Sequence, residues 1–432
     1  MTPRALLLGS FQAALAAADP LVIVPRHLPA PPRGRTIVVG AGKAAASMAK
    51  AVENNWPADK PLEGLVITRY AHGYSGEDAL KRIRVVEAGH PVPDAAGEAA
   101  AREIMALVKS AKPEDLVLVL VSGGGSSLLA MPAGDVSMED LKSVTRDLLA
   151  CGAPIQEINV VRKHLSAIQG GRLAAASAAP IRALIISDVV GDNPTAIASG
   201  PTAADTSTYI DALTYLKMYR ITPPVSITRH LSNGARGEIA ETLKPFDPVF
   251  DKVENLVIAT ALASLNAAAA FFQQHGITPM VMGDSVTGEA RMIGHAYAVL
   301  AMHALSGSHV LKPPMAIISG GECTVTLSGA NQARRARGGR CTEFLLSLGI
   351  TLDGCEGITA IACDTDGIDG SENNAGGLLF PDSLPRALAA GVNANIALAT
   401  NDAYGFFEAT NDLVVTGPTR TNVNDFRVML IR

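Results

Sequence analysis

Short runs of apolar residues with no polar face recur along the chain. They alternate with segments whose apolar residues are spaced three or four positions apart. The first pattern is typical of strands buried on both sides of a parallel sheet, and the second is typical of amphipathic helices. The runs predict strands at 36–39, 65–67, 116–121, 181–186, 256–261, 280–282, 315–318 and 358–362. The pattern therefore predicts an α/β fold with mainly parallel sheets.

Helical spacing occurs at the N-terminus and in several later segments. The apolar positions of the N-terminal helix are Leu7, Phe11, Ala14, Leu15 and Ala18. Arg4 followed by apolar residues also resembles a signal peptide. Ser10 and Gln12 interrupt that apolar run, so a packed helix is the favoured interpretation. Further helical segments are predicted at 44–52, 98–110, 138–176 and 203–252.

The length of the chain predicts two domains. A chain of 432 residues is too long for one ordinary hydrophobic core. Prolines at 223–224 and 245–248 interrupt the second half of the helical region, so the domains are expected at 1–245 and 246–432. The first helix is free in this interpretation to pack on either half.

Composition restricts the class of partner and the compartment. The net charge of −5 gives no support for nucleic acid or an anionic membrane as a partner. No segment after the N-terminus is long enough to cross a bilayer without charge. The five cysteines are scattered, odd in number and without a CxxC pair, which argues against a disulfide framework and a zinc site. We therefore expect a reducing, cytoplasmic location.

A glycine-rich loop directly follows the strand predicted at 116–121. Its residues are Ser122, Gly123, Gly124, Gly125, Ser126 and Ser127. Three glycines let the backbone turn sharply and approach a ligand closely, and the serines can cap a following helix. A strand, a glycine loop and a helix start present backbone N–H groups to an anion. The loop predicts a phosphate or carboxylate site, with a tight strand-to-helix turn as the structural alternative.

A second glycine loop follows the strand predicted at 36–39. Gly40 and Gly42 match the dinucleotide-binding pattern G-x-G-x-x-A, but the next strand ends in Thr68-Arg69, without an acidic residue for a ribose. Lys43 stands at the start of the following helix, where its charge opposes the helix dipole. An anion would justify that position, and the backbone N–H groups of the loop with Gly40 and Gly42 could bind its phosphate. A solvated surface lysine is the alternative.

Polar side chains in the first half supply further candidates. His90 lies in a rigid loop after a strand and could contact a substrate or bond loop backbone. Asp188 and Asp192 follow the strand at 181–186, where carboxylates suit Mg²⁺ or simply form a turn. Arg162 and Lys163 are adjacent on a helix and could neutralise a phosphate or carboxylate, although their side chains diverge by about 100°. A solvated face with salt bridges is the alternative for that pair.

The second half repeats the pattern of strands that end in polar residues. The strand at 315–318 leads into two glycines and Glu322, and a basic, glycine-rich stretch covers 334–340. That stretch favours anion capture over base stacking, because it contains no aromatic residue. The strand at 358–362 ends in acids that include Asp366. Their spacing does not fit an EF-hand, so Mg²⁺, ligand hydroxyls and turn capping stay open.

These motifs together resemble the class II glycerate kinases, or glycerate 2-kinases, whose C-terminal half is called the MOFRL domain. They occur in the family's order over nearly the whole chain. The matching stretches are 40–43, 89–94, 122–127, 159–166, 187–192, 319–322, 364–370 and 416–425.

The resemblance implies a Rossmann-like N-terminal domain and a MOFRL-type α/β domain with an active-site cleft between them. It also implies phosphorylation of D-glycerate to 2-phosphoglycerate, with ATP and Mg²⁺ as cofactors. In the family, the lysine after the first strand acts at the transferring phosphate, here Lys43, and a C-terminal arginine assists, here Arg340. Cys341 departs from the family pattern, which commonly has asparagine at this position.

The expected roles follow phosphoryl-transfer chemistry, which needs positioning and charge stabilisation. Lys43 would neutralise the γ-phosphoryl oxygens and Arg340 would stabilise the transition state. Asp188 would orient or deprotonate the 2-hydroxyl. The predicted metal ligands are Asp192, Glu322 and Asp366, and the predicted substrate residues are Arg162, Lys163 and His90.

Two alternatives to the kinase stay open. Related sequences are often labelled hydroxypyruvate reductases, so the first alternative is an NAD(P)H-dependent hydroxypyruvate reductase. The second is a regulatory protein that binds a sugar acid without catalysis. In every interpretation the partner is a small molecule, and a homodimer is one candidate for the assembly.

Overall fold

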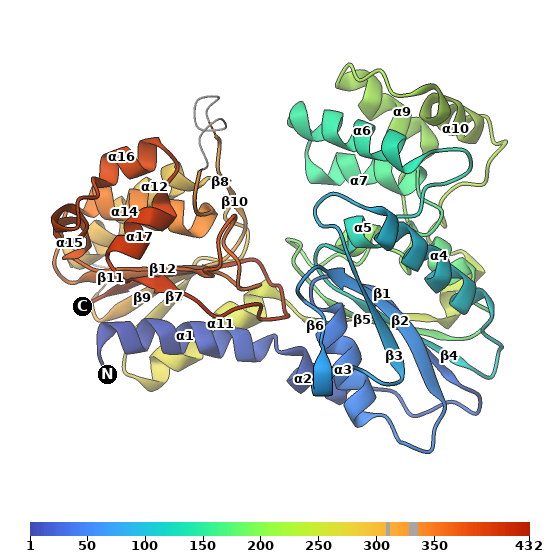
Figure 1. Ribbon diagram of the computed structural model, residues 1–432, viewed down its shortest axis with the longest axis horizontal. Coiled ribbons are helices and arrows are strands. Elements are labelled where there is room, and N and C mark those ends of the chain that lie inside the picture. Colours follow the sequence, from blue (N-terminus) through green and yellow to red (C-terminus); the bar gives the residue numbers. More distant parts are fainter. Residues whose placement is uncertain (308–311, 328–335) are drawn as a thin grey trace. The chain divides into compact units, whose positions relative to one another are not determined.

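The computed structural model describes residues 1–307, 312–327 and 336–432 (Figure 1). They form two compact units: Pro20–Ile258, which we call the middle unit, and Met1–Asp19 with Ala259–Arg432, which we call the end unit. Compared with the expected domains, the first helix lies with the C-terminal half and the division falls at 258/259. The boundary lies later in the chain than expected because the strand that ends at Ala259 belongs to the sheet of the middle unit.

The middle unit is built on a six-stranded sheet. The strands are β1 (Thr36–Ala41), β2 (Leu62–Arg69), β3 (Ile83–Ala88), β4 (Leu116–Val121), β5 (Ile181–Ile186) and β6 (Val253–Ala259). Their order is β3-β2-β1-β4-β5-β6, and the β1–β2, β1–β4, β2–β3 and β4–β5 pairs are parallel, as predicted. In this order the chain reverses direction across the sheet between β1 and β4, where ligands bind in such folds.

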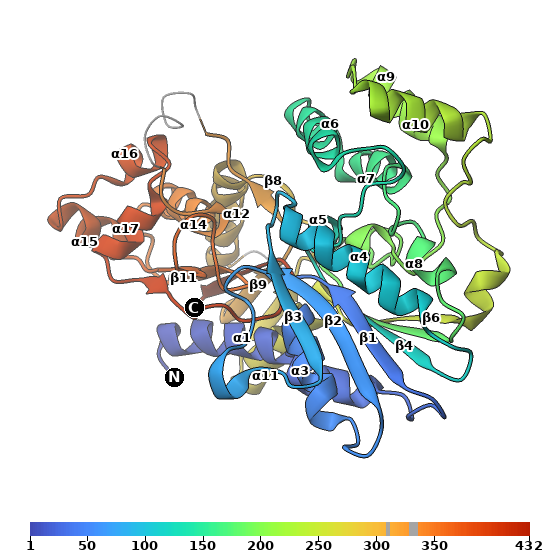
Figure 2. The ribbon, with the colours of Figure 1, turned by 45° about the vertical axis from the view of Figure 1, so that its right-hand side comes forward.

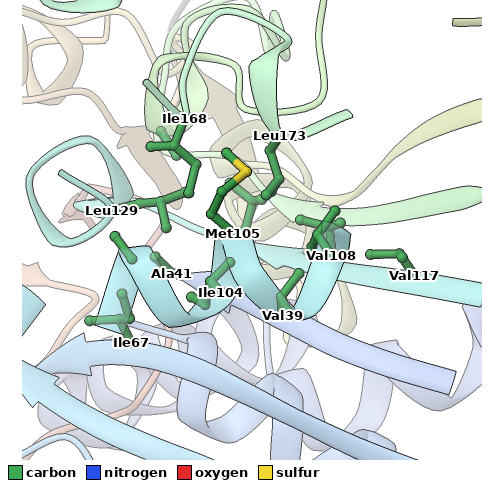
Figure 3. Close-up of a cluster of buried hydrophobic side chains, with 14 of the residues drawn as sticks. Val39, Ala41, Ile67, Ile104, Met105, Val108, Val117, Leu129, Ile168 and Leu173 are labelled. Atoms are coloured by element: carbon green, nitrogen blue, oxygen red, sulfur yellow. The ribbon is translucent and has the colours of Figure 1, made fainter. Parts of the chain in front are cut away.

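One face of this sheet is covered by helix α4 (Ala95–Lys109), which corresponds to the helix expected at 98–110. Asp94 begins the helix by accepting a hydrogen bond of 2.9 Å from the Gly97 N–H. Figure 3 shows Ile104 and Val108 of α4 among the side chains of the sheet, with Val39 of β1 nearby. These side chains are fully buried, so truncating one to alanine would cost about 2–5 kcal/mol.

A separate helical layer completes the middle unit. Helices α6 (Met138–Ala150), α7 (Ile155–His164), α9 (Tyr209–Met218) and α10 (Val225–Ala235) lie together beside the sheet (Figure 2). They share an apolar core that contains Val144, Val161 and Leu216. The other helices of the unit are α2 (Pro20–Ile23), η1 (Val24–His27), α3 (Ala45–Asn55), η2 (Gly76–Asp78), α5 (Gly125–Leu128), α8 (Arg172–Ala175), η3 (Ile197–Ser199) and η4 (Pro248–Lys252).

The end unit has its own six-stranded sheet in the order β13-β12-β11-β14-β9-β7. Its strands are β7 (Thr278–Val281), β9 (Met315–Ser319), β11 (Ile358–Asp364), β12 (Gly376–Leu379), β13 (Leu413–Val414) and β14 (Asp425–Ile431). The β7–β9 pair is parallel, but the β11–β12, β11–β14, β12–β13 and β14–β9 pairs are antiparallel. The expectation of mainly parallel sheets was wrong here, because β12 follows β11 through a loop and no helical crossover connects them.

Helices of the end unit cover this sheet. They are α1 (Pro3–Ala17), α11 (Ala261–Gln274), α12 (Ala290–Leu305), α14 (Arg340–Leu352), α15 (Ser383–Ala389), α16 (Ala394–Ala399) and α17 (Ala403–Ala409), and the remaining strands are β8 (Gly288–Glu289) and β10 (Cys323–Thr324). The predicted N-terminal helix is confirmed as α1. Its residues Leu7 and Phe11 are buried in a cluster with Leu265 and Phe272 of α11.

Within residues 1–307, 312–327 and 336–432, no single helix is long and apolar enough to cross a bilayer. The pair Pro3–Ala17 and Pro20–His27 meets the criteria of length and composition only when both helices are taken together, and a bend of 46° separates them.

Candidate active site

Hydrogen bonds join the loops after β1 and β4. These loops lie where the chain reverses direction across the sheet of the middle unit. The Lys43 N–H donates to the Gly123 carbonyl oxygen at 2.8 Å, and the Ala44 N–H donates to Ser122 Oγ at 3.0 Å. The Gly42 N–H donates to the Ile67 carbonyl oxygen at 3.1 Å. The three N–H groups at 42–44 are therefore bonded within the protein.

Close packing also explains why the loop after β1 has glycine at two positions. A Cβ atom on Gly40 would lie 1.9 Å from the Leu120 carbonyl oxygen, and one on Gly42 would lie 2.1 Å from Ser122 Oγ. Gly42 has in addition a φ of 143°, which side chains rarely adopt. Gly40, Gly42 and Ser122, which we had expected to bind phosphate, thus have structural partners in this fold.

The glycine loop after β4, at residues 122–127, has backbone N–H groups that are available to a ligand. The N–H groups of Gly123, Gly124 and Ser126 have no acceptor anywhere in the described part of the chain. By contrast, the Gly125 N–H donates to the Ser122 carbonyl oxygen and the Ser127 N–H to the Gly124 carbonyl oxygen, both at 3.2 Å. Three available N–H groups beside the start of α5 can donate to an anion.

Two side chains flank this loop. A Cβ atom on Gly124 would lie 2.9 Å from the His90 ring and 3.4 Å from Lys43 Cγ, so both side chains contact the glycine. His90 is held by its own loop, because Asp94 accepts a 2.9 Å hydrogen bond from the Gly89 N–H as well as capping α4. The ammonium of Lys43 adds a positive charge to the N–H groups of the loop.

Asp188 lies on the neighbouring strand end. Val121 of β4 is opposite Ile185 of β5, so Asp188 leaves the sheet at the same edge as the glycine loop. Its side chain is partly buried. Asp192 lies farther along in a turn with φ 53°, where its N–H donates to the Val189 carbonyl oxygen at 3.0 Å. Asp192 therefore forms part of a turn, which was the alternative considered for these acids.

Arg162 and Lys163 are adjacent on α7 but have different surroundings. Lys163 Nζ forms a buried 2.7 Å ion pair with Asp205 Oδ1. Arg162 has no acidic partner in the described part of the chain, and it lines a narrow cavity. Burial lowers the pKa of Arg162 to about 10, because no carboxylate compensates for lost hydration. This shift corresponds to roughly 3 kcal/mol of unfavourable free energy.

The Lys163–Asp205 pair yields a prediction about acid stability. Burial opposes the charge of Asp205, but Lys163 and hydrogen bonds from Ser207 outweigh it and lower the pKa of the Asp205 carboxyl. A lowered carboxyl pKa adds stability above the unfolded-state value of about 3.9, and that stability is lost as pH falls through the folded-state value. We expect Asp205→Asn to lower the thermal unfolding midpoint strongly at pH 7 and progressively less below about pH 4.

The measurement is a series of thermal unfolding curves between pH 3 and pH 7. Breaking a buried pair by removing one partner costs about 3–5 kcal/mol. Asp59→Asn is a matched control, because Asp59 is exposed. A D205N midpoint equal to that of the unmodified protein at pH 7 would contradict this account of Lys163.

A charge cluster surrounds Arg340 in the end unit. Its Nε donates to Asp425 Oδ1 at 2.6 Å and its Nη2 to Asp364 Oδ2 at 2.7 Å, while Nη1 lies 3.0 Å from Glu322 Oε1. Burial opposes the charge of Arg340, but the three carboxylates outweigh it and raise its pKa well above the usual value. Asp425 is also paired with the buried Arg427. Arg340 therefore has a structural role whatever else it does.

The acids after β11 also have structural partners. Asp369 accepts hydrogen bonds from the N–H groups of Cys341 and Thr342, both at 2.9 Å, so it caps the N-terminus of α14. The Ile368 N–H donates to Asp366 Oδ1 at 2.9 Å, which places Asp366 in a local turn. Capping was one of the alternatives considered for this motif. Asp369 caps a helix and Asp366 caps a turn, so it applies to both acids. Cys341 itself is buried in the core of the end unit.

Two family models match the chain. Residues 6–232 match a family described as a domain of unknown function, DUF4147, and residues 315–425 match the MOFRL family. A Pyrococcus horikoshii protein named glycerate 2-kinase is 37% identical over 92% of this chain and 88% of its own length. The chain belongs to the class II glycerate kinase family.

Other relatives of this glycerate kinase family member bear two kinds of name. A Thermotoga maritima protein named D-glycerate 2-kinase is 37% identical over 92% of this chain and 91% of its own. An Agrobacterium vitis protein named putative hydroxypyruvate reductase is 48% identical over 100% of this chain and 95% of its own. A crystal structure of a glycerate kinase from Thermotoga maritima matches with a TM-score of 0.84 and 35% identity, covering 98% of both chains.

Within this family framework, the structure brings part of the predicted site together. Lys43 and His90 meet at Gly124, and Ser126 connects that loop to the cavity of Arg162. Lys163 is engaged elsewhere, and Arg340, Glu322 and Asp366 belong to the end unit. Part of the basic stretch at 334–340, namely Arg334 and Arg335, lies outside the described residues.

Sequence reasoning missed the partners that hold these residues. Asp205, which pairs with Lys163, lies in a region interpreted only as helical and polar. Asp425 and Arg427, which complete the Arg340 cluster, lie on β14, a strand that was not predicted. One signal was available: these two charges alternate with apolar residues in 425–431, so they share one face of a strand.

The predicted metal ligands do not form a preassembled centre. Among the described residues, no group of three or more His, Cys, Asp or Glu side chains is placed to hold a metal ion. Mg²⁺ in kinases uses one or two protein carboxylates with substrate phosphates and water, so a smaller donor set is sufficient. The assignments of Asp192, Glu322 and Asp366 to the metal therefore stay predictions.

Glu322 offers a direct test of that assignment. Its side chain is 57% exposed, so its pair with Arg340 contributes at most about 1 kcal/mol. If Glu322 helps to hold Mg²⁺, Glu322→Gln should leave the thermal unfolding midpoint nearly unchanged and raise the Mg²⁺ concentration for half-maximal activity about tenfold. Mg²⁺ titration of the phosphorylation rate measures this, with Glu356→Gln as the control. An unchanged Mg²⁺ requirement would remove Glu322 from the metal site.

Proposed function

We propose that the protein is a glycerate 2-kinase that transfers the γ-phosphoryl group of ATP to the 2-hydroxyl of D-glycerate with Mg²⁺. The observation that carries this proposal is the loop at 123–126, whose three available N–H groups lie beside Lys43. Backbone donors and a cation at the carboxyl edge of a parallel sheet suit a phosphate. The names of the relatives support glycerate as the substrate.

The proposed reaction uses the chain's own residues for positioning and charge. The 2-hydroxyl oxygen attacks the γ-phosphorus, the bond from that phosphorus to the ADP oxygen breaks, and Asp188 accepts the hydroxyl proton. Lys43 and the loop N–H groups stabilise the negative charge on the transferring group. Arg340 stays a proposed contributor from the end unit. Mg²⁺, when bound, neutralises phosphate oxygens, and Asp192, Glu322 or Asp366 would supply carboxylate ligands.

A hydroxypyruvate reductase is the second candidate, because the sheet order and the G-x-G-x-x-A pattern at 40–45 are those of dinucleotide-binding folds. Two observations weigh against it. The N–H groups at 42–44 are bonded within the protein, and β2 ends in Thr68-Arg69 without an acid for a ribose.

A product assay decides between the two. The protein is incubated with D-glycerate, ATP and Mg²⁺, and ³¹P NMR follows ADP and phosphoglycerate. A parallel reaction contains hydroxypyruvate with NADH or NADPH and follows nicotinamide absorbance. Magnesium-dependent 2-phosphoglycerate supports the kinase, and nicotinamide oxidation without phosphoryl transfer overturns it. We also propose a cytoplasmic location, consistent with five free cysteines, and gel filtration would test for a homodimer.

A further inference from the structure

A narrow cavity in the middle unit lies between the glycine loop and the helical layer. Ser126 contributes to it from the start of α5, Arg162 and Ser166 from α7 and the turn after it, and Met131 and Leu141 give it apolar walls. The centre of a water-sized group can move through only about 20 Å³ of this space. The volume suits one small polar group and excludes a sugar ring.

Two hydrogen-bond donors of this cavity lack acceptors. The guanidinium of Arg162 makes no hydrogen bond or ion pair in the described part of the chain, and no acidic residue occurs among the undescribed positions. Ser166 Oγ accepts from the N–H groups of Ile168 and Gln169 at 3.2 and 3.1 Å, but its own hydroxyl proton has no acceptor among the described residues. An unpaired cation beside an unused hydroxyl donor is the complement of an anion.

The cavity is rigidly built. Gln169 Nε2 donates to the carbonyl oxygens of Ser126 and Leu129 at 2.9 and 3.2 Å, which ties the turn after α7 to the glycine loop. Ser126 Oγ lies 2.9 Å from Ser199 Oγ. Ser126 thus belongs to both the cavity wall and the loop with available N–H groups. An anion in the cavity would lie beside a phosphoryl group bound at that loop.

We propose that this cavity binds the substrate carboxylate, with Arg162 as its main ligand and Ser166 as a second donor. This inference rests on the proposed function and deepens it. It separates Arg162 from its neighbour Lys163, whose charge is already matched by Asp205. Arg162 is a binding residue in this assignment.

The test compares Arg162→Met with Arg162→Lys and with the control Arg146→Met. Arg146 is an exposed arginine on the neighbouring helix α6, so the control removes the same charge outside the cavity. Steady-state kinetics use saturating ATP with D-glycerate or its neutral amide, glyceramide. We expect R162M to raise KM for D-glycerate about 100-fold and to remove the preference over glyceramide. R162K should raise KM about tenfold, and R146M should match the unmodified protein.

Thermal unfolding distinguishes a binding role of Arg162 from a structural role. If Arg162 were structural, R162M would have a lower unfolding midpoint than the unmodified protein. Because the partly buried guanidinium has no acceptor in the described part of the chain, R162M should have an unfolding midpoint equal to or above that of the unmodified protein in the absence of ligand. D-Glycerate should raise the midpoint of the unmodified protein and of R146M, but not that of R162M. A strongly lowered midpoint or misfolding of R162M, together with unchanged KM in R162K, would overturn the proposal.

The outcomes separate this inference from the proposed function. If the unmodified protein phosphorylates D-glycerate and R162M does so with unchanged KM, the carboxylate site is wrong and the kinase stands. If the unmodified protein shows no kinase activity but D-glycerate stabilises it and not R162M, the kinase is wrong and the carboxylate site stands. If D-glycerate neither reacts with the unmodified protein nor stabilises it, both are wrong.

Discussion

Lys43→Met is expected to lower kcat for D-glycerate phosphorylation about 1,000-fold. In the proposed reaction Lys43 supplies the positive charge beside the loop at 123–126, where negative charge accumulates during phosphoryl transfer. A thousandfold change in rate corresponds to about 4 kcal/mol of transition-state stabilisation. The measurement is the single-turnover rate of ADP formation, because it reports chemistry separately from product release.

Lys50→Met is the matched control for this experiment. Lys50 lies on α3, the helix that follows Lys43, and its ammonium pairs with exposed Asp78 and lies 4.2 Å from the centre of the Tyr74 ring. K50M should retain the full rate. Thermal unfolding of K43M should stay close to that of the unmodified protein, so a slow and unstable K43M would assign the lysine to folding. A single-turnover rate within threefold of the unmodified value would remove Lys43 from the reaction.

Arg340→Met is expected to destabilise the end unit by about 3–5 kcal/mol and to abolish measurable activity. Its removal takes an ion-pair partner from the buried carboxylates of Asp364 and Asp425, and Asp425 retains its pair with Arg427. Removing one partner of a buried ion pair costs about 3–5 kcal/mol. The measurement is the unfolding midpoint in urea, together with kcat under conditions where R340M remains folded.

A second variant separates the structural role of Arg340 from its proposed catalytic role. R340M/D364N removes the cation and one buried charge together, so we expect it to regain a large part of the lost stability. If Arg340 also stabilises the transition state, this double variant stays at least 100-fold slower than the unmodified protein. Full recovery of both stability and activity would assign Arg340 to the structure alone. The result is informative because three carboxylates already neutralise this guanidinium.

Much of the fold could be predicted from apolar patterning. The runs at 116–121 and 181–186 coincide with β4 and β5, because strands buried on both faces need apolar side chains throughout. The same pattern does not report strand direction, which explains the wrong expectation for the second sheet. β14 was missed because Asp425 and Arg427 interrupt its apolar run, and the sequence does not show that the two charges are buried as a pair.

The site could be predicted less completely, because residue type does not reveal a residue's tertiary partner. Gly40 and Gly123 look alike in sequence, yet one glycine gives β1 room to pass the backbone of β4 and the other leaves its N–H group available. Arg162 and Lys163 are likewise equivalent candidates in sequence. Asp205, which is distant in the chain, engages one of them and leaves the other unpaired.

The place of α1 in the end unit has a consequence for synthesis of the protein. The helix leaves the ribosome before α11, against which Leu7 and Phe11 pack, because Pro20–Ile258 is synthesised between them. At usual translation rates this delay is on the order of tens of seconds. During that time the middle unit can fold, but the apolar face of α1 cannot yet pack against α11. Ribosome-bound chains that end before α11 should therefore be the stage most exposed to aggregation and most dependent on chaperones.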